Sequence, residues 1–286
     1  MRLDGLRRQL ALIIEDAGIE NPWLEATVLV DHVLSLDRTA QILKADMEVD
    51  EAECKALLEL AHRRAAHVPM AYITGHREFY GLDFIVSEDT LIPRPDSEVL
   101  VETALERIGD GDGVLDLCTG TGCIGISIAS RRRLSHLTLV DISTAALDVA
   151  RANVRRHLPD AEVETVQGDL YTPLPSGRRF KAIVSNPPYI RWDLRETLSE
   201  EVLKEPVLAL HDADADALGI IRRIVAQAPA HLENPGFLAI ECDYRQSMPL
   251  VQIMHKNGFH DISVRKDLAG LDRVVCGCWE GECTNN

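Results

Sequence analysis

The sequence predicts an α/β fold in which a mostly parallel, seven-stranded sheet is covered by helices on both faces and is preceded by a small helical domain. From residue 114 onward, strand-like segments alternate with helical patterns, which is typical of a parallel sheet. Residues 1–70 carry helical periodicity only. The last two strands are joined by just "DLAG", which is too short for a parallel crossover, so we expect their pairing to be antiparallel.

The first 70 residues read as a run of helices. Asn21 followed by Pro22 predicts a helix start, with a capping side chain and a proline at the first helical position. One apolar face follows at helical spacing, formed by Ala26, Leu29, Val30, Val33 and Leu34. Asp50 and Glu53 predict a capping box for a helix that ends before Pro69. We therefore expect residues 1–70 to form a separate domain.

Residues 71–95 change character and predict a hairpin that links the two domains. Aromatic and β-branched residues surround Gly81, and the segment ends in "IPRP", whose two prolines flank Arg94 and favour an extended backbone. Asp96 is expected to cap the helix that opens the second domain, residues 96–286. We expect its strands at 114–117, 136–140, 162–166, 180–185, 236–242, 260–266 and 272–279, with helices at 143–157 and 217–232.

Composition narrows the class of protein. The chain of 286 residues is 46% hydrophobic and 27% charged, as expected of a globular protein with a real core. It lacks both a run of roughly 18 apolar residues and the pattern of a secretory signal, which predicts a cytoplasmic protein with no membrane contact. The net charge of −16 argues against binding of the protein to the phosphate backbone of DNA or RNA, so no direct nucleic-acid partner is expected.

Seven scattered cysteines indicate a reducing compartment rather than a disulfide framework. The tightest group is Cys276, Cys278 and Cys283, which raises the question of a zinc site. Alternation along the final strand explains Cys276 and Cys278 without a metal, and we expect none.

The stretch "VLDLCTGTGCIGISIA" reads as a buried strand, a tight loop of small residues and a helix. Its candidate ligand-binding residues are Cys118, Thr119, Gly120, Thr121 and Gly122. The glycines remove side chains where backbone approaches a ligand, and the helix N-terminus presents free N–H groups. The alternative is an ordinary strand-to-helix turn. No phosphate-binding lysine follows the loop, which favours an adenosine ligand without phosphates.

Two acids follow the next two strands. Asp141 ends "LTLVD", about 20 residues after the glycine loop, where a carboxylate can accept from both ribose hydroxyls; it could also cap the next helix. Asp169, in "QGDLY", follows the third strand and is next to Leu170. Because the carboxyl ends of parallel strands share one edge, we expect the loop and both acids to meet there.

The segment "VSNPPYI" ends the fourth strand at the same edge. Pro187 and Pro188 donate no N–H, so they stiffen a turn that cannot pair as a strand. We expect the Asn186 carboxamide oxygen and the Pro187 carbonyl to accept both hydrogens of a planar –NH2 group, with Tyr189 stacking on that group. An ordinary proline turn is the alternative. We call the two acceptors, Asn186 Oδ1 and the Pro187 carbonyl, the clamp. Beside an adenosine ligand, the clamp predicts methyl transfer from S-adenosylmethionine to an amide or amino nitrogen, without a metal.

The motifs "DLCTGTGCIGI", "SNPPYI", "YITGHREFYGLDFIVSEDTLIPRPDSE", "EPVLAL" and "DLAGLDRVV" together resemble the peptide chain release factor glutamine methyltransferases, the HemK or PrmC group. The N-terminal "NPWLEATVLVDHVL" extends the resemblance over nearly the whole chain. The resemblance implies a class I, Rossmann-like S-adenosylmethionine-dependent methyltransferase domain after the helical domain. It implies as substrate the glutamine of the Gly-Gly-Gln loop of release factors, methylated on its side-chain amide nitrogen, and S-adenosylhomocysteine as the product of the cofactor.

The resemblance also assigns roles by motif match. The segment Cys118–Gly122, Asp141, the pair Asp169 and Leu170, and Asn186 would bind the cofactor. The catalytic residues would be Asn186, Pro187 and Tyr189, and the glutamine would be held by Asn186, Pro187, Pro188 and Tyr189, with Arg94 bordering the pocket. The expected partner is a release factor, docked by the helical domain, and the enzyme is expected to be a monomer.

Two positions depart from the family pattern. Cys118 stands where the family usually has glycine, and because cysteine disfavours positive φ we expect an ordinary backbone conformation there. Asp243 follows the fifth strand where glycine is frequent. Three other functions stay open: methylation of a ribosomal-protein glutamine, methylation of an exocyclic amino group on a flipped DNA or RNA base, and a non-catalytic binding module.

Overall fold

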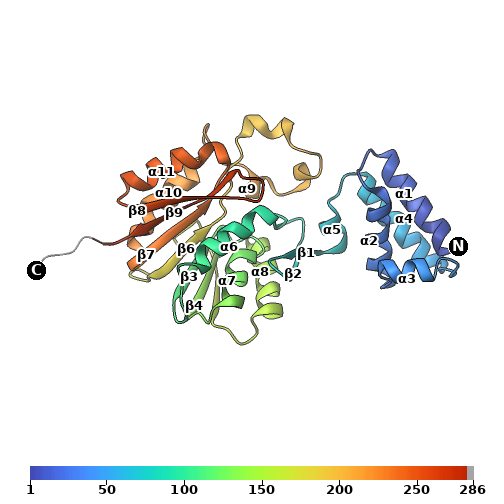
Figure 1. Ribbon diagram of the computed structural model, residues 1–286, viewed down its shortest axis with the longest axis horizontal. Helices are drawn as coiled ribbons and strands as arrows, with labels where there is room; N and C mark the ends of the chain where they lie inside the picture. Colours follow the sequence, from blue (N-terminus) through green and yellow to red (C-terminus); the bar gives the residue numbers. More distant parts are fainter. Residues whose placement is uncertain (282–286) are drawn as a thin grey trace, which may run out of the picture. The chain divides into compact units, whose positions relative to one another are not determined.

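The computed structural model describes residues 1–281, which divide into two compact units. The first unit contains Met1–His76 together with the short segment Ser199–Lys204, and the second contains Arg77–Leu198 and the chain from Glu205 onward. Figure 1 traces the elements of both along the chain. Each unit has its own hydrophobic core.

The first unit is helical, as the sequence predicts. Its helices are α1 (Leu3–Asp16), α2 (Pro22–Leu34), α3 (Arg38–Leu43), α4 (Glu51–Ala65) and α5 (Met70–Thr74). The core takes Leu6 and Leu10 from α1, Leu29 from α2 and Leu57 from α4. The capping box of Asp50 and Glu53 is confirmed.

The prediction for Asn21 was wrong in one respect. Pro22 is the first residue of α2, as expected, but Asn21 adopts a left-handed conformation, with φ 56°, and its side chain makes no capping hydrogen bond. Asparagine tolerates this region of φ and ψ better than most residues, so it turns the chain here instead of capping the helix.

The segment Ser199–Lys204, which includes the 3-10 turn η3 (Val202–Lys204), joins the first unit through charged side chains. Arg64 is 3% exposed, and its guanidinium donates to Glu25 at 2.7 Å and to Glu201 at 2.6 Å. A buried guanidinium needs such partners, because an unpaired buried charge is strongly unfavourable. The helical unit is thus completed by residues from a distant part of the chain.

The hairpin predicted around Gly81 is confirmed, with strands β1 (His76–Phe79) and β2 (Leu82–Ile85) in a two-stranded sheet. The 3-10 turn η1 (Pro95–Ser97) and helix α6 (Glu98–Leu105) follow. Asp96 does not cap this helix, contrary to prediction, because it lies within η1 and Ser97 stands at the N-cap. The Asp96 carboxylate instead lies 3.3 Å from the guanidinium of Arg273.

The second unit contains the predicted seven-stranded sheet, in the order β5-β4-β3-β6-β7-β9-β8. Its strands are β3 (Gly113–Leu117), β4 (His136–Asp141), β5 (Val163–Gln167), β6 (Phe180–Ser185), β7 (Leu232–Glu241), β8 (His260–Lys266) and β9 (Asp272–Trp279). The first five strands in this order pair in parallel. β9 pairs antiparallel with both β7 and β8, so the antiparallel last strand is confirmed.

Helices cover both faces of the sheet. Successive strand residues point to opposite sides, so apolar side chains on each face are buried against helices. The remaining helices are α7 (Cys123–Arg131), α8 (Thr144–His157), α9 (Val207–Leu210), α10 (Gly219–Gln227) and α11 (Ser247–Lys256). Val114 packs in one core with residues of α6, α7 and α8, whereas its neighbour Leu115 packs in the other with residues of α10 and α11. β3 is buried along its whole length, and it therefore lies between two hydrophobic layers.

The strand order reverses at β3, whose neighbours are β4 and β6. In open α/β sheets, ligands bind at such a switch point, outside the carboxyl ends of the strands. Cys276 and Cys278 lie on β9, as predicted, while Cys283 lies outside the described residues. No helix among residues 1–281 has the length and apolar character that a membrane span requires.

Candidate active site at the strand ends

A cavity of about 240 Å³ opens at the carboxyl ends of β3, β4 and β6. Most of the residues singled out from the sequence line it, namely Arg94, Cys118, Thr119, Gly120, Thr121, Asp141, Asp169, Leu170, Asn186 and Pro188. Gly122, Pro187 and Tyr189 lie outside this lining. The fold thus brings together segments that are far apart in the sequence, as the strand-end argument requires.

The glycine loop turns sharply through residues with positive φ. Cys118 has a φ of 58°, so the expectation of an ordinary backbone conformation there was wrong. The loop is held from both sides: the Thr119 N–H donates to the Val140 carbonyl at 3.1 Å, and the Thr119 hydroxyl donates to Asp116 at 2.6 Å. Contacts of this kind can hold a residue in a conformation that is unfavourable by roughly 1–3 kcal/mol. A glycine at 118 would adopt the same turn at lower cost.

Asp116 supports the loop from within β3. Its Oδ2 atom accepts from Thr119 and also from the N–H of Gly125, at 3.0 Å, in the first turns of α7. Its Oδ1 atom has no partner among the described residues. The side chain is completely buried, and this burial raises the pKa of Asp116 to about 7.

Asp141 contacts the glycine loop directly. One carboxylate oxygen accepts from the Gly120 N–H and the other from the Ser143 N–H, both at 2.9 Å. The alternative interpretation of Asp141 as a helix cap was wrong, because Ser143 caps α8 through the N–H of Ala146 at 3.2 Å. Burial raises the pKa of Asp141 above its ordinary value. Asp141 thus belongs to the cavity rather than to the helix end.

Both arginines that line the cavity are paired with carboxylates. Arg223 lies 2.6 Å from Asp169, and Arg94 pairs with Glu205, which also accepts from the Ile92 N–H at 3.0 Å. Among the described lining residues no lysine is present. A phosphate group would therefore find no unpaired cation there, which agrees with the sequence argument for a ligand without phosphates.

The Asn-Pro-Pro-Tyr loop begins beside the glycine loop. The Ser185 hydroxyl donates to the Leu117 carbonyl at 2.8 Å and so joins the ends of β6 and β3. The Asn186 Nδ2 atom donates to the Ser97 hydroxyl at 3.2 Å. Among residues 1–281, no hydrogen bond reaches Asn186 Oδ1 or the Pro187 carbonyl. Asn186 lines the cavity and Pro187 follows it outside the lining, and neither of these two oxygens has a donor within the described residues.

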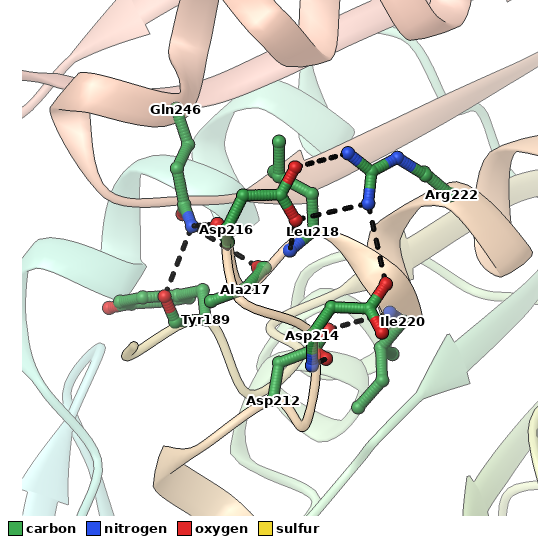
Figure 2. Close-up of polar contacts among 9 residues, drawn as sticks. All are labelled: Tyr189, Asp212, Asp214, Asp216, Ala217, Leu218, Ile220, Arg222 and Gln246. Atoms are coloured by element: carbon green, nitrogen blue, oxygen red, sulfur yellow. Dashed lines mark hydrogen bonds and ion pairs between the residues drawn. The ribbon is translucent and has the colours of Figure 1, made fainter. Parts of the chain in front are cut away.

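Tyr189 lies outside the lining of the cavity and is held by hydrogen bonds at both its hydroxyl and its carbonyl. Its hydroxyl donates to Glu241 at 3.2 Å. Figure 2 shows its carbonyl accepting from Gln246, at 3.1 Å, while the same amide group also donates to the carbonyls of Asp216 and Ala217. The stacking role expected for Tyr189 stays a prediction. These contacts tie the loop to two segments that follow it in the chain.

Sequence reasoning missed several residues of the site. Ser97, Ile142 and Leu208 line the cavity, and Glu205 fixes Arg94 beside it. A signal existed for each: Ser97 is in the "IPRPDSE" motif, Ile142 follows Asp141, and Glu205 and Leu208 belong to "EPVLAL". These motifs are recognisable in the sequence, but their side-chain contacts depend on the folded sheet.

Comparison with known proteins covers both units. The family described as PrmC N-terminal domain matches residues 6–75, and the family described as Methyltransferase small domain matches residues 94–207. A methyltransferase structure from Pyrococcus furiosus is 17% identical, covers 71% of this chain and 91% of its own, and has a TM-score of 0.55, which supports the methyltransferase fold.

Curated relatives match nearly the full length. The release factor glutamine methyltransferase of Burkholderia pseudomallei is 42% identical over 261 residues, covering 89% of this chain and 91% of its own. That of Geobacter sulfurreducens is 38% identical over 275 residues, covering 96% and 94%. Coverage of this extent includes the helical unit, the glycine loop and the Asn-Pro-Pro-Tyr loop. The chain belongs to the release factor glutamine methyltransferase family.

Proposed function

We propose that this protein transfers a methyl group from S-adenosylmethionine to the side-chain amide nitrogen of the glutamine in the Gly-Gly-Gln motif of peptide chain release factors. The names of the full-length relatives support this substrate. The observation that carries the proposal is the pair of available acceptors, Asn186 Oδ1 and the Pro187 carbonyl, next to the cavity bordered by the glycine loop. A substrate that is a translation factor also favours a cytoplasmic location.

The lining of the cavity fits an adenosine-based, cationic ligand. Gly120 has a φ of 55°, and a Cβ built on it meets no atom within 4 Å, so the loop leaves open space for a ligand. Asp141 and Asp169 supply carboxylates, and the two lining arginines are already paired. We propose that Cys118–Gly122, Asp141, Asp169 and Leu170 hold the cofactor. When bound, the cofactor supplies an activated sulfonium methyl group.

The Asn-Pro-Pro-Tyr loop would orient the glutamine. An amide nitrogen is a poor nucleophile, because its lone pair is delocalised into the carbonyl group. Two acceptors that hold both N–H groups would favour a lone pair directed at the methyl group, and they would stabilise the positive charge that develops on nitrogen. Pro187 and Pro188 fix φ in this loop, so the acceptors need little reorganisation when substrate binds.

The variant Asn186→Ala tests this clamp. We expect turnover to fall by roughly 100-fold or more, because an acceptor that orients the reacting nitrogen is lost. The dissociation constant of the cofactor should change only slightly. Turnover is measured by mass spectrometry of release factor incubated with enzyme and cofactor, and Asn257→Ala, at the end of α11, is the matched control. Unchanged turnover in Asn186→Ala would refute the clamp and favour a different catalytic arrangement.

The alternative substrates are tested in the same assay with tritiated cofactor. The net charge of −16 disfavours a DNA or RNA substrate, whose phosphates prefer a basic surface. We expect label in release factor and not in duplex DNA, RNA or ribosomal protein. Label entering any of these in place of release factor would overturn the proposed substrate, and no transfer at all would favour a binding module.

We also propose that the helical unit helps to dock the release factor, since two acceptors cannot select one glutamine among many. Ile42 and Leu43 on α3 are 61% and 81% exposed, which gives this unit apolar side chains for a partner. The double variant Ile42→Ser with Leu43→Ser should raise KM for intact release factor more than for a short Gly-Gly-Gln peptide. Equal effects on both substrates would count against docking.

A further inference from the structure

The carboxylate of Glu241 is buried at the end of β7. Its side chain is 1% exposed, yet Glu241 belongs neither to the cavity lining nor to any motif predicted to bind a ligand. Its Oε1 atom accepts from the Tyr189 hydroxyl at 3.2 Å. Burial raises the pKa of Glu241 to about 7, and the neighbouring Ser97 side chain acts in the opposite direction. Glu241 is therefore in contact with both η1 and the Asn-Pro-Pro-Tyr loop.

Ser97 connects this carboxylate to the clamp. It is 3% exposed, and its hydroxyl oxygen accepts from Asn186 Nδ2 at 3.2 Å. A serine hydroxyl has a single proton, and a buried hydroxyl that accepts from one neighbour donates that proton to another. The Oε2 atom of Glu241 has no hydrogen-bond partner among the described residues, and it is the acceptor available to this proton when Glu241 is ionised. This assignment of the proton gives a directed chain, in which Asn186 donates to Ser97 and Ser97 donates to Glu241.

The direction of this chain decides which end of the Asn186 amide faces the cavity. The –NH2 group and the oxygen of a carboxamide have nearly the same shape, so packing alone does not distinguish them. With the Ser97 proton committed to Glu241, Ser97 can only accept, and Nδ2 must face it. Oδ1 is then left as the acceptor. If Ser97 donated instead, the amide would turn and present N–H groups to the N–H groups of a glutamine.

We propose that Ser97 and Glu241 are positioning residues that fix the orientation of the Asn186 carboxamide, while Glu241 anchors the other end of the same loop through Tyr189. The inference rests on the proposed function, because it explains how the clamp is held ready for a glutamine nitrogen. Neither residue touches the reacting atoms. Other charged groups near Glu241 are Arg273 on β9 and Asp96 in η1, and they pair with each other at 3.3 Å.

The kinetic test compares conservative and disruptive variants of one position. Ser97→Ala removes the acceptor for Nδ2, and we expect kcat for release factor to fall by roughly 10-fold or more, with the cofactor dissociation constant unchanged within about 2-fold. Ser97→Thr keeps a hydroxyl and should restore most of the turnover. In Glu241→Gln the new amide group can donate to Ser97, so the Ser97 proton is no longer committed to position 241. This variant should therefore also lower kcat. Ser127→Ala is the matched control, a fully buried serine whose hydroxyl has no partner among the described residues.

A second measurement does not depend on activity. In a two-dimensional spectrum of side-chain amides, the Asn186 pair is identified by its absence in Asn186→Ala. Ser97→Ala should shift this pair and speed its exchange with water, whereas Ser97→Thr and Ser127→Ala should leave it in place. If the wild-type protein methylates no release factor, the proposed function fails, and this spectrum still decides the inference.

Two results would overturn the inference while leaving the proposed function intact. One is wild-type kcat and an unchanged Asn186 amide pair in Ser97→Ala. The other is a loss of turnover in Ser97→Ala that Ser97→Thr does not restore, since a hydroxyl at this position would then be irrelevant to the orientation of the amide.

Discussion

The glycine loop and the Asn-Pro-Pro-Tyr loop face the same cavity, and each is supported by one buried carboxylate. Asp116 supports the first and Glu241 the second. In both, one oxygen is hydrogen bonded and the other has no partner among the described residues, and burial raises the pKa of each to about 7. Their partners differ in origin: those of Asp116 are 3 and 9 positions away in the chain, whereas Tyr189 is 52 positions from Glu241.

This difference shows that the two loops are specified at different levels. The conformation of the glycine loop depends on its backbone and on side chains within one strand-loop-helix unit. A short stretch of sequence therefore determines most of this conformation. The Asn-Pro-Pro-Tyr loop is stiff by itself, but the direction of its amide depends on η1, β7 and η5 (Tyr244–Gln246). Backbone changes should damage the first loop most, and distant side-chain changes the second.

The largest effect on stability is expected from Gly122→Val. Gly122 has a φ of 80°, and a Cβ built on it lies 2.9 Å from Ile126 Cδ1. A valine would therefore combine a disfavoured backbone conformation with overpacking, and we expect the free energy of unfolding to fall by about 3 kcal/mol. Urea denaturation followed by circular dichroism measures this change.

Gly120→Ala is the comparison within the same loop. Its φ is also positive, at 55°, but a Cβ there meets no atom within 4 Å, so only backbone strain of about 1 kcal/mol is expected. Equal losses in the two variants would mean that packing against Ile126 is unimportant. The glycine loop would then be less strictly determined by its own unit than we infer.

The two buried carboxylates predict how stability depends on pH. Their ordinary pKa values are 3.8 for Asp116 and 4.5 for Glu241, and burial raises both to about 7 in the folded protein. Between about pH 4 and pH 7 the unfolded chain therefore releases protons that the folded chain keeps. The free energy of unfolding should fall as pH rises through this window and level off above it, with each group contributing about 3–4 kcal/mol.

Asp116→Asn and Glu241→Gln should each remove part of this fall, because a neutral amide does not titrate. The measurement is urea denaturation of each variant and of the wild type from pH 5 to pH 8. Asp46→Asn, at an exposed carboxylate in the helical unit, controls for the change in net charge. Curves parallel to that of the wild type would show that the carboxylates are not the source of the pH dependence.

The same comparison explains how much could be predicted from the sequence. The strand positions, the antiparallel final strand and the two loops followed from alternation and from turn chemistry, which act over a few residues. Asp141 was found because strand ends meet at one edge of a parallel sheet. These are features for which local pattern and topology are sufficient.

The errors and omissions have physical reasons. A cysteine at positive φ is locally unfavourable, and Cys118 adopts it because Asp116 and the Val140 carbonyl hold Thr119 in place. Ser97 and Glu241 lie on separate elements, and only the assembled sheet brings them to Asn186 and Tyr189. Sequence patterns report burial of a carboxylate poorly, since acids are usually exposed.

The smallest effect is expected behind the second loop, at Gln246. Its amide group donates to the carbonyls of Tyr189, Asp216 and Ala217, so it joins the loop to the turn before α10 (Figure 2). Gln246→Ala leaves these carbonyls without that donor and should loosen the loop without moving the glycine loop. We expect kcat to fall by about 5- to 10-fold, with the cofactor dissociation constant unchanged.

Arg222→Ala is the control on the same turn. Its guanidinium is 45% exposed and pairs with Asp214 and Asp216, and exposed ion pairs contribute little to stability, typically below about 1 kcal/mol. The turn is held instead by Asp212, which accepts from the N–H groups of Asp214 and Ile220 at 2.8 and 2.7 Å. Activity should thus survive Arg222→Ala and decline in Gln246→Ala. If both variants kept wild-type kcat, the second loop would be stiff enough by its prolines alone, and the contrast between the two loops would reduce to the orientation of one amide.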